Sequence, residues 1–176
     1  IILSTGLSTF DEVCQTVKFI QKTNSIYDNK EMLCVLQCTS MYPIPESEAN
    51  LNILETFKKE FRVTIGYSDH TEDIEALYLA AITEADVLEF HFTDTKEGKT
   101  FRDHKVSLTK DDIDLLVNKI NRANIIFGSN IKAPTKSELE NKHLITFRRA
   151  IYPNRDIQMG EKISKDDLIA LRPNNG

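Results

Sequence analysis

Short apolar runs alternate with amphipathic segments along the first two thirds of the chain, and this alternation strongly restricts the fold. The runs that predict β-strands cover residues 1–3, 32–38, 63–65 and 87–92. The segments that predict helices begin near residue 8 and then cover about 46–61, 71–85 and 109–127. Strict alternation is typical of a parallel sheet with crossover helices. Four such units predict an α/β protein, either half of an eight-stranded barrel or a small open sheet.

The alternation stops after Gly128. Residues 133–138 have the composition of a linker with a short capped helix, and strand-like pieces follow around residues 159–161. We therefore expect two parts, residues 1–142 and residues 143–176.

Composition excludes several classes of protein. Hydrophobic residues make up 40% of the 176 positions and charged residues 28%, and no apolar run approaches the roughly 20 residues that cross a membrane. A net charge of −5 argues against a nucleic-acid partner. The three cysteines lack the spacing of a disulfide framework, which favours a reducing cytoplasm. Because the first apolar run begins at Ile1, we expect this chain to be a fragment.

Polar residues follow each predicted strand. These residues are Ser4-Thr-Gly6, Thr39-Ser-Met-Tyr-Pro43, Tyr67-Ser-Asp-His-Thr71 and His91, with Asp103-His104 after a loop. The carboxyl ends of parallel strands meet at one edge, so these groups are expected to converge. Hydroxyls near helix N-termini suit a phosphate or carboxylate, and Ser4, Thr5, Ser40 and Ser68 are the candidates. Ordinary turns and helix caps are the alternative.

Two histidines suggest a metal site. His70 and His91 are 91 − 70 = 21 positions apart, the length of one strand, helix and strand unit, so neighbouring parallel strands would bring their imidazoles together. Asp69 and Asp103 could orient them or complete the ligand shell, as suits a divalent first-row ion. The alternative is a pair of hydrogen-bonded loop residues. Tyr42 is either a packed loop aromatic or a hydroxyl offered to a substrate.

Seven motifs, taken in order, resemble the sialic acid synthase family, which includes N-acetylneuraminate synthase and related nonulosonic acid synthases. The motifs are Ile2-Leu-Ser-Thr-Gly6, Cys38-Thr-Ser-Met-Tyr-Pro43, Gly66-Tyr-Ser-Asp-His-Thr71, Glu89-Phe-His-Phe-Thr93, Asp103-His104, Pro134-Thr-Lys-Ser-Glu138 and Arg172-Pro-Asn-Asn-Gly176. The resemblance covers essentially the whole chain.

The resemblance implies a TIM-barrel fold followed by a small antifreeze-like (SAF) domain, in a domain-swapped homodimer. It begins at the fifth barrel strand. Residues 1–142 would then hold the last four βα units of the barrel, and residues 143–176 the linker and the start of the antifreeze-like domain.

The resemblance also implies a reaction, in which phosphoenolpyruvate condenses with an N-acetylated hexosamine such as N-acetylmannosamine to give a nine-carbon 2-keto acid. A divalent ion, commonly Mn²⁺ with Mg²⁺ or Co²⁺ as alternatives, is held by the residues that match His70 and His91.

The other matched positions fall into three groups. Ser4, Ser40 and Ser68 match phosphoenolpyruvate-binding residues, Tyr42 and Asp103 match sugar-site residues and are the candidate catalytic side chains, and Arg172 matches an arginine that the antifreeze-like domain offers to the partner's sugar.

Departures from the family pattern keep the sugar open. Phe90 replaces the usual basic residue, and the loop at residues 94–102 lacks the usual Pro-Gly-Pro, so a legionaminic or pseudaminic acid type synthase is the alternative. The first barrel half, which supplies a catalytic glutamate and lysines in the family, has no match here. We therefore expect the chain alone to be inactive, or to pair with another copy or another chain. The alternative from another class is a non-catalytic module that binds metal or a partner.

Overall fold

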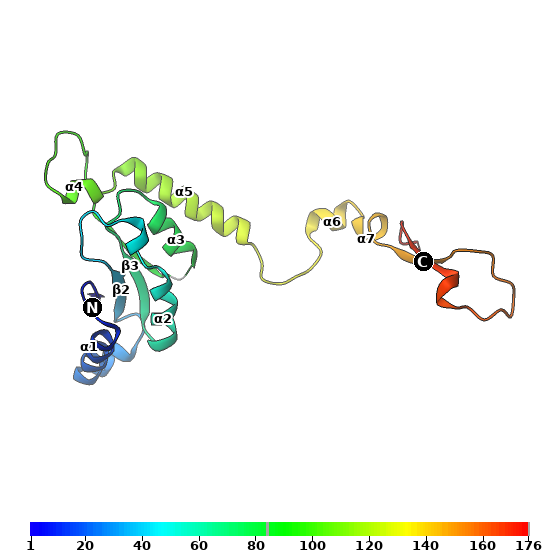
Figure 1. Cartoon of the computed structure of the whole chain (residues 1–176), viewed down its shortest axis with the longest axis horizontal. Coiled ribbons are helices and arrows are strands. Elements are labelled where there is room, and N and C mark those ends of the chain that lie inside the picture. The colour runs from blue at the N-terminus through cyan, green and yellow to red at the C-terminus, as the bar shows by residue number, and fades with distance from the viewer. Residues whose placement is uncertain (84, 176) are drawn as a thin grey trace. The chain divides into compact units, whose positions relative to one another are not determined.

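The computed structural model of the chain describes residues 1–83 and 85–175. Glu84, within the helix predicted at residues 71–85, and Gly176, at the end of the last motif, lie outside the described residues. The chain divides into two compact units, residues 1–128 and 129–176 (Figure 1). The boundary expected between residues 142 and 143 falls within the second unit.

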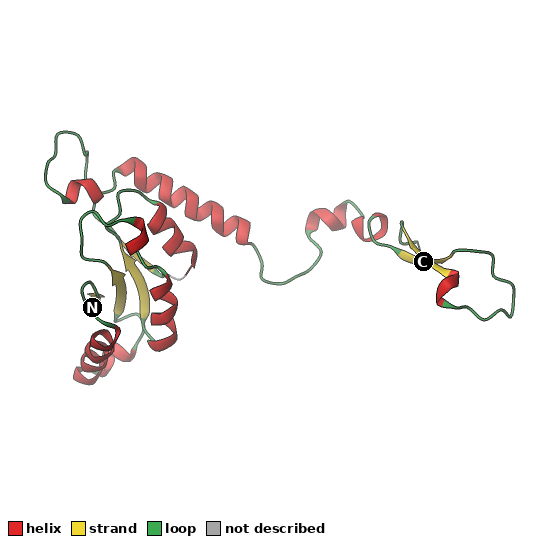
Figure 2. Cartoon of the chain, in the orientation of Figure 1, coloured by secondary structure: helices red, strands yellow, loops and turns green. Residues whose placement is uncertain are grey.

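The first unit is built on one parallel sheet, as the alternation of strands and helices predicts (Figure 2). Its strands are β1 (Ile2–Ser4), β2 (Cys34–Cys38), β3 (Thr64–Ser68) and β4 (Val87–Glu89). They pair in sequential order, β1-β2-β3-β4, and every pairing is parallel. This order is the one in which strands follow each other around a barrel.

Helices and short 3₁₀ turns connect the strands. They are α1 (Phe10–Thr23), η1 (Ser25–Asp28), η2 (Glu46–Glu48), α2 (Asn52–Glu60), α3 (Glu75–Thr83), α4 (Asp103–Val106) and α5 (Lys110–Phe127). Capping boxes start α1 and α5: the side chains of Thr9 and Thr109 accept from the third helical amide, and Glu12 and Asp112 accept in return from the cap amides. Within the described residues, no helix is both long and apolar enough to cross a membrane.

Several predicted elements have different bounds in the structure, and three of them show what shifts a boundary. The predicted helix at 46–61 is divided into η2 and α2, because Asn50 has a left-handed φ of 50° that interrupts the helical path. The predicted helix at 71–85 begins only at Glu75, whose amide donates to the Asp73 side chain (2.8 Å). The fourth strand ends at Glu89, not at residue 92 as predicted. Beyond it, Phe92 forms an isolated parallel bridge with Leu108, which precedes α5.

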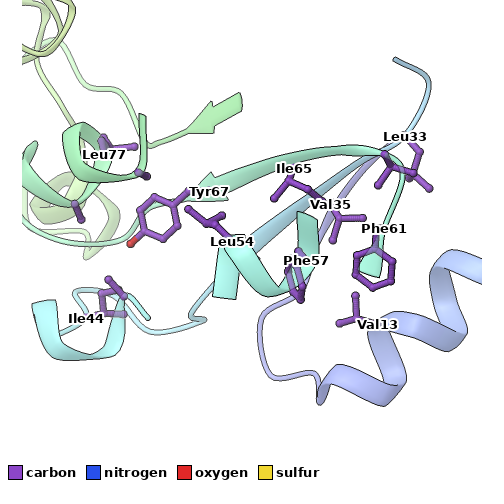
Figure 3. Close-up of a cluster of buried hydrophobic side chains, with 14 of the residues drawn as sticks. Val13, Leu33, Val35, Ile44, Leu54, Phe57, Phe61, Ile65, Tyr67 and Leu77 are labelled. Atoms are coloured by element: carbon purple, nitrogen blue, oxygen red, sulfur yellow. The ribbon is translucent and has the colours of Figure 1, made fainter. Parts of the chain in front are cut away.

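The hydrophobic core lies between the sheet and its helices (Figure 3). Side chains of a strand alternate between its two faces, and Val35, Ile65 and Tyr67 supply the strand contribution to the core. Leu54 and Leu77 pack against them from α2 and α3, and all five side chains are fully buried. The alternate positions, Cys34, Leu36 and Cys38 of β2 and Thr64, Gly66 and Ser68 of β3, therefore face the other side of the sheet.

The second unit contains α6 (Lys136–Glu140), α7 (His143–Thr146), β5 (Ala150–Pro153), η3 (Lys165–Asp167) and β6 (Leu168–Leu171). Strands β5 and β6 are antiparallel, and Ala150 pairs with Leu171. The strand-like pieces expected in this part of the chain are present as β5 and β6, but they flank residues 159–161. Residues 159–160 themselves form a turn in which Gly160 has a φ of 88°. The assignment of this unit to an antifreeze-like domain stays a prediction.

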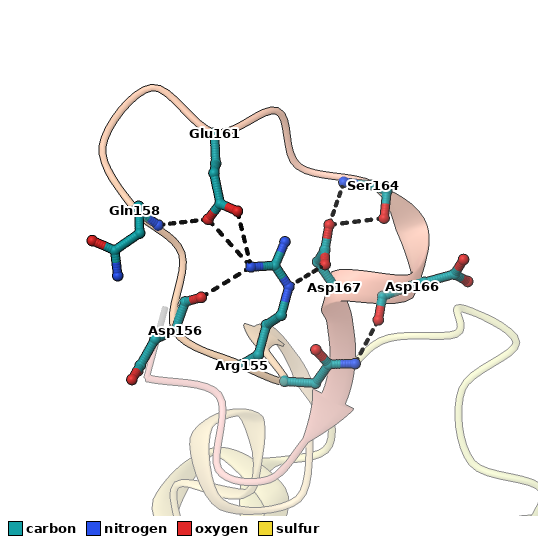
Figure 4. Close-up of polar contacts among 8 residues, drawn as sticks. Arg155, Asp156, Gln158, Glu161, Ser164, Asp166 and Asp167 are labelled. Carbon is teal, nitrogen blue, oxygen red and sulfur yellow. Dashed lines mark hydrogen bonds and ion pairs between the residues drawn. The ribbon is translucent and has the colours of Figure 1, made fainter.

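A polar cluster closes the loop between β5 and β6 (Figure 4). The Nε of Arg155 donates to Asp167 (2.6 Å), and its terminal nitrogen donates to Glu161 (3.2 Å). The backbone amide and the hydroxyl of Ser164 both donate to Asp167 (2.8 Å each). These contacts join the two ends of the loop, which explains why it remains a turn between the strands.

Candidate functional site

The face of the sheet opposite the core carries polar groups in matching rows. Register pairs Cys38 of β2 with Ser68 of β3, and Ser68 with Glu89 of β4. Because side chains alternate, His70 and His91 continue the same face two positions beyond Ser68 and Glu89. The carboxyl edge of the sheet therefore gathers residues from three neighbouring strands.

Two glycines allow close packing around this site. Gly66 pairs with Leu36 and Val87 one row below Ser68, and a Cβ at Gly66 would lie 2.5 Å from both Leu36 Cδ2 and the Val87 carbonyl oxygen. Leu36 and Val87 thus pack over Gly66, in the row of the sheet next to the polar row formed by Cys38, Ser68 and Glu89. A Cβ at Gly6 would lie 2.0 Å from Ser40 Oγ, so the turn after β1 can approach the Ser40 hydroxyl only because it has no side chain there.

The two histidines lie side by side on a tyrosine. The ring centroids of His70 and His91 are 5.3 Å apart, and the Tyr42 ring lies 4.1 Å from His70 and 5.5 Å from His91. His70 Nδ1 lies 2.9 Å from the Thr39 carbonyl oxygen. A carbonyl can only accept, so Nδ1 carries the proton and the neutral ring keeps the Nε2 lone pair for a ligand.

Cys38 adds a thiol to this cluster. Its Sγ is 4.0 Å from His70 Nδ1, and the hydroxyls of Ser68 and Ser4 also interact with it. Burial raises the pKa of Cys38, but these hydrogen bonds outweigh it and leave the pKa below the ordinary value. Burial lowers the pKa of His70, yet the contacts with Cys38 and Thr39 raise it overall. Cys38 therefore belongs to the site.

Tyr42 also contacts the loop that precedes α4. The guanidinium carbon of Arg102 lies 5.0 Å from the centre of the Tyr42 ring, and Arg102 Nε is 3.6 Å from Asp103 Oδ1. Burial raises the pKa of Tyr42, and the negative charge of Asp103 adds to this shift. The structure therefore brings the two candidate catalytic side chains, Tyr42 and Asp103, to the same side of the cluster.

The three candidate serines differ in their surroundings. Ser68 is 2% exposed and donates to Glu89 Oε1 (2.8 Å), whereas Ser4 and Ser40 are exposed. Glu89 was missed by the sequence reasoning. The signal that could have revealed it is the period of two, which places Glu89 on the same face as His91.

Arg172 belongs to the second unit, directly after β6. Its guanidinium carbon lies 5.7 Å from the centre of the Phe147 ring. The assignment of Arg172 to a sugar site stays a prediction.

The donor set at the two histidines fits a divalent ion that keeps several positions for water or substrate. Imidazole nitrogens suit first-row ions, and the hydrogen bond of His70 to Thr39 is the outer contact that usually fixes the tautomer of a histidine ligand. Within residues 1–83 and 85–175, no group of three or more His, Cys, Asp or Glu side chains is arranged to hold a metal ion.

Sequential parallel strands with polar groups at their carboxyl edge define an α/β protein of the TIM-barrel type, whose functional sites lie at that edge. The chain belongs to the NeuB family, whose family model matches residues 1–132. The resemblance drawn from the seven motifs is thereby confirmed.

Three relatives illustrate this membership. The chain is 38% identical to an N,N'-diacetyllegionaminic acid synthase of Legionella pneumophila, over 100% of this chain and 48% of the relative. It is 34% identical to the enzyme of the same name from Campylobacter jejuni, over 100% and 51%. A solved N-acetylneuraminic acid synthetase of Leptospira borgpetersenii, in complex with citrate, superposes with a TM-score of 0.67 at 31% identity, over 81% of this chain and 47% of that one. The chain thus spans about half the length of these relatives.

Proposed function

We propose that this chain is part of a phosphoenolpyruvate-dependent nonulosonic acid synthase, which condenses phosphoenolpyruvate with an N-acetylated hexosamine to give a 2-keto sugar acid. The observation that carries the proposal is the cluster of His70, His91 and Tyr42 beside the Ser68–Glu89 pair. The two N,N'-diacetyllegionaminic acid synthases, which align with the full length of this chain, support the same reaction class.

The serines would bind the anionic substrate. Ser68 and Ser4 face the polar row, and Ser40 lies against the turn at Gly6, so three hydroxyl donors surround one edge of the sheet. Hydroxyl donors of this kind suit the phosphate and carboxylate oxygens of phosphoenolpyruvate. The Ser68 hydroxyl donates its one proton to Glu89 Oε1, so it would turn from Glu89 toward phosphoenolpyruvate when that substrate binds.

His70 and His91 would hold a divalent ion, with Mn²⁺ as the first choice. Such an ion, when bound, polarises a carbonyl oxygen as a Lewis acid and so activates the aldehyde of an open-chain sugar. The Tyr42 ring packs against both imidazoles and limits their rotation. Tyr42 and Asp103 would also meet the sugar hydroxyls, and in a homodimer Arg172 would serve the sugar site of the partner subunit.

Metal binding is tested with single histidine variants. His70→Ala and His91→Ala are each expected to weaken Mn²⁺ binding by more than the about 10–100-fold typical of a lost outer-shell contact, measured by calorimetry and by electron paramagnetic resonance. His104→Ala is the matched control, since this imidazole bonds Thr93 Oγ1 (3.1 Å) instead. Unchanged Mn²⁺ binding in both site variants rules out the two-histidine site.

Turnover is tested by following phosphate and 2-keto acid from phosphoenolpyruvate and a sugar. N-acetylmannosamine and a diacetamido hexose, offered in competition, distinguish the sialic from the legionaminic type of reaction. We expect no turnover by this chain alone, and product formation by the purified chain contradicts that expectation. The second candidate is a non-catalytic module, which Mn²⁺ binding by a chain that gives no product in any assembly would support.

A further inference from the structure

Asp69 has a buried carboxylate and lies between Ser68 and His70, the two residues at the end of β3 that face the site. Ser68 and His70 point to the polar row, whereas Asp69 points to the opposite, helix-covered side, as strand alternation requires. Asp69 is only 2% exposed. No hydrogen bond joins its carboxylate to an imidazole among the described residues, so Asp69 does not orient His70 through its ring.

The Asp69 carboxylate instead joins the strand to the turn that follows it. Its Oδ1 accepts from the Tyr67 hydroxyl (2.8 Å) and from the backbone amide of Thr71 (3.1 Å), and its Oδ2 accepts from the Thr71 hydroxyl (2.9 Å). Tyr67 is fully buried in the core, and Thr71 is buried as well. The carboxylate therefore anchors residues 67–71 to the rigid side of the sheet.

The backbone of this segment is held from the neighbouring elements too. The amide of Asp69 donates to the Glu89 carbonyl (2.9 Å), and the His70 carbonyl accepts from the Ile44 amide (3.0 Å). With the backbone so fixed, the His70 ring reaches the Thr39 carbonyl through Nδ1. A change on the buried side at Asp69 must therefore alter the direction of the groups on the open side.

We propose that Asp69 is a positioning residue, whose buried carboxylate holds the 67–71 turn so that Ser68 and His70 face the site in fixed directions while Asp69 itself contacts no ligand. The proposal deepens the proposed function, because it concerns the same site. Its main test needs neither metal nor substrate.

The test uses Asp69→Asn, which keeps the shape but places an amide nitrogen against a hydroxyl or amide donor. We expect ¹⁵N spectra of the metal-free chain, recorded where the imidazole is neutral, to show His70 changing from one Nδ1-protonated form to a mixture of tautomers. Mn²⁺ affinity of the folded variant should fall about 10–100-fold, as for other outer-shell contacts. Asp112→Asn is the matched control. Asp112 lies in α5, outside the site, and accepts from the amide and hydroxyl of Thr109 (2.9 and 2.8 Å). The His70 signals should therefore be unchanged in Asp112→Asn.

A merely structural role gives a different result. If Asp69→Asn lowers only the unfolding midpoint, and His70 keeps its tautomer and its Mn²⁺ affinity, the proposal is overturned. If Asp69→Asn does not fold, Thr71→Val removes a single donor and is subject to the same criterion. If the wild-type chain binds no Mn²⁺ but the His70 tautomer still responds to Asp69→Asn, the metal function fails and the positioning role stands.

Discussion

Ser68 of β3 and Glu89 of β4 occupy the same row of the sheet, and the Ser68 hydroxyl donates a 2.8 Å hydrogen bond to Glu89 Oε1. Ser68 is buried, whereas Glu89 is exposed. The pair thus directs a buried hydroxyl toward the open side of the sheet, where an anionic ligand can reach it.

Removing this hydroxyl should weaken phosphoenolpyruvate binding. We expect Ser68→Ala to raise the dissociation constant about fivefold, since one net hydrogen bond contributes about 1 kcal/mol, as measured by calorimetry with Mn²⁺ present. Glu89→Gln keeps an acceptor for Ser68 and should change the affinity much less. Ser25→Ala, in η1, is the control. An Ser68→Ala chain that binds phosphoenolpyruvate like the wild type would falsify the assignment of Ser68.

Gly66→Ala should destabilise the sheet directly below the site. Its new Cβ would lie 2.5 Å from the Val87 carbonyl oxygen, a backbone atom that can move only with β4. We expect a loss of about 1–3 kcal/mol in the free energy of unfolding, measured with urea, together with shifted amide signals at Ser68. Gly98→Ala meets nothing within 4 Å but is strained by its φ of +71°, so it is a control only for the Ser68 signal, which it should leave in place. Wild-type stability in Gly66→Ala contradicts the described packing.

Two cysteines of equal burial should differ in reactivity. Cys34 is 7% and Cys38 8% exposed. Burial raises the pKa of Cys34 to about 11, while hydrogen bonds from His70 and Ser68 hold the pKa of Cys38 below its ordinary value despite burial. At pH 8 in the metal-free native chain, iodoacetamide should modify Cys38 at least about tenfold faster than Cys34, as followed by mass spectrometry. In urea the two rates should converge, and equal rates in the native chain argue against the thiol cluster.

The second unit should lose stability in acid through Asp167. The hydrogen bond from Arg155, followed by those from Ser164, lowers the pKa of Asp167 to about 2. A folded pKa below the unfolded value of about 3.9 means that the stabilisation is complete above that value and is lost as the pH falls toward 2. Amide signals of β5 and β6 should report this loss between about pH 4 and 2. Asp167→Asn should be less stable at neutral pH and should not show this dependence.

Periodicity alone predicted much of the first unit. The four strands, the parallel sheet and the capped starts of α1 and α5 depend on local patterns, and those patterns act over only a few residues. Helix starts at α2 and α3 were predicted too early. Asn50 takes a left-handed conformation before α2, and a turn closed by the contacts of Asp69 with Thr71 precedes α3. Both delays come from local turns that helical periodicity does not reveal.

Some residues of the candidate site could likewise be predicted from the sequence, and others could not. His70 and His91 could be paired from their spacing of one strand, helix and strand unit. Glu89 and Cys38 joined the site only through the register of β2, β3 and β4, because a register joins residues that are far apart in the chain.

The sequence by itself determined the α/β class, the family and the edge of the sheet at which polar groups collect, since all three follow from local order along the chain. The tertiary structure alone decided which atoms meet: the Ser68 hydroxyl with Glu89, His70 Nδ1 with Thr39, and the Asp69 amide with the Glu89 carbonyl oxygen. Hydrogen bonds act over about 3 Å, and only the packing of strands and helices brings distant residues within that range.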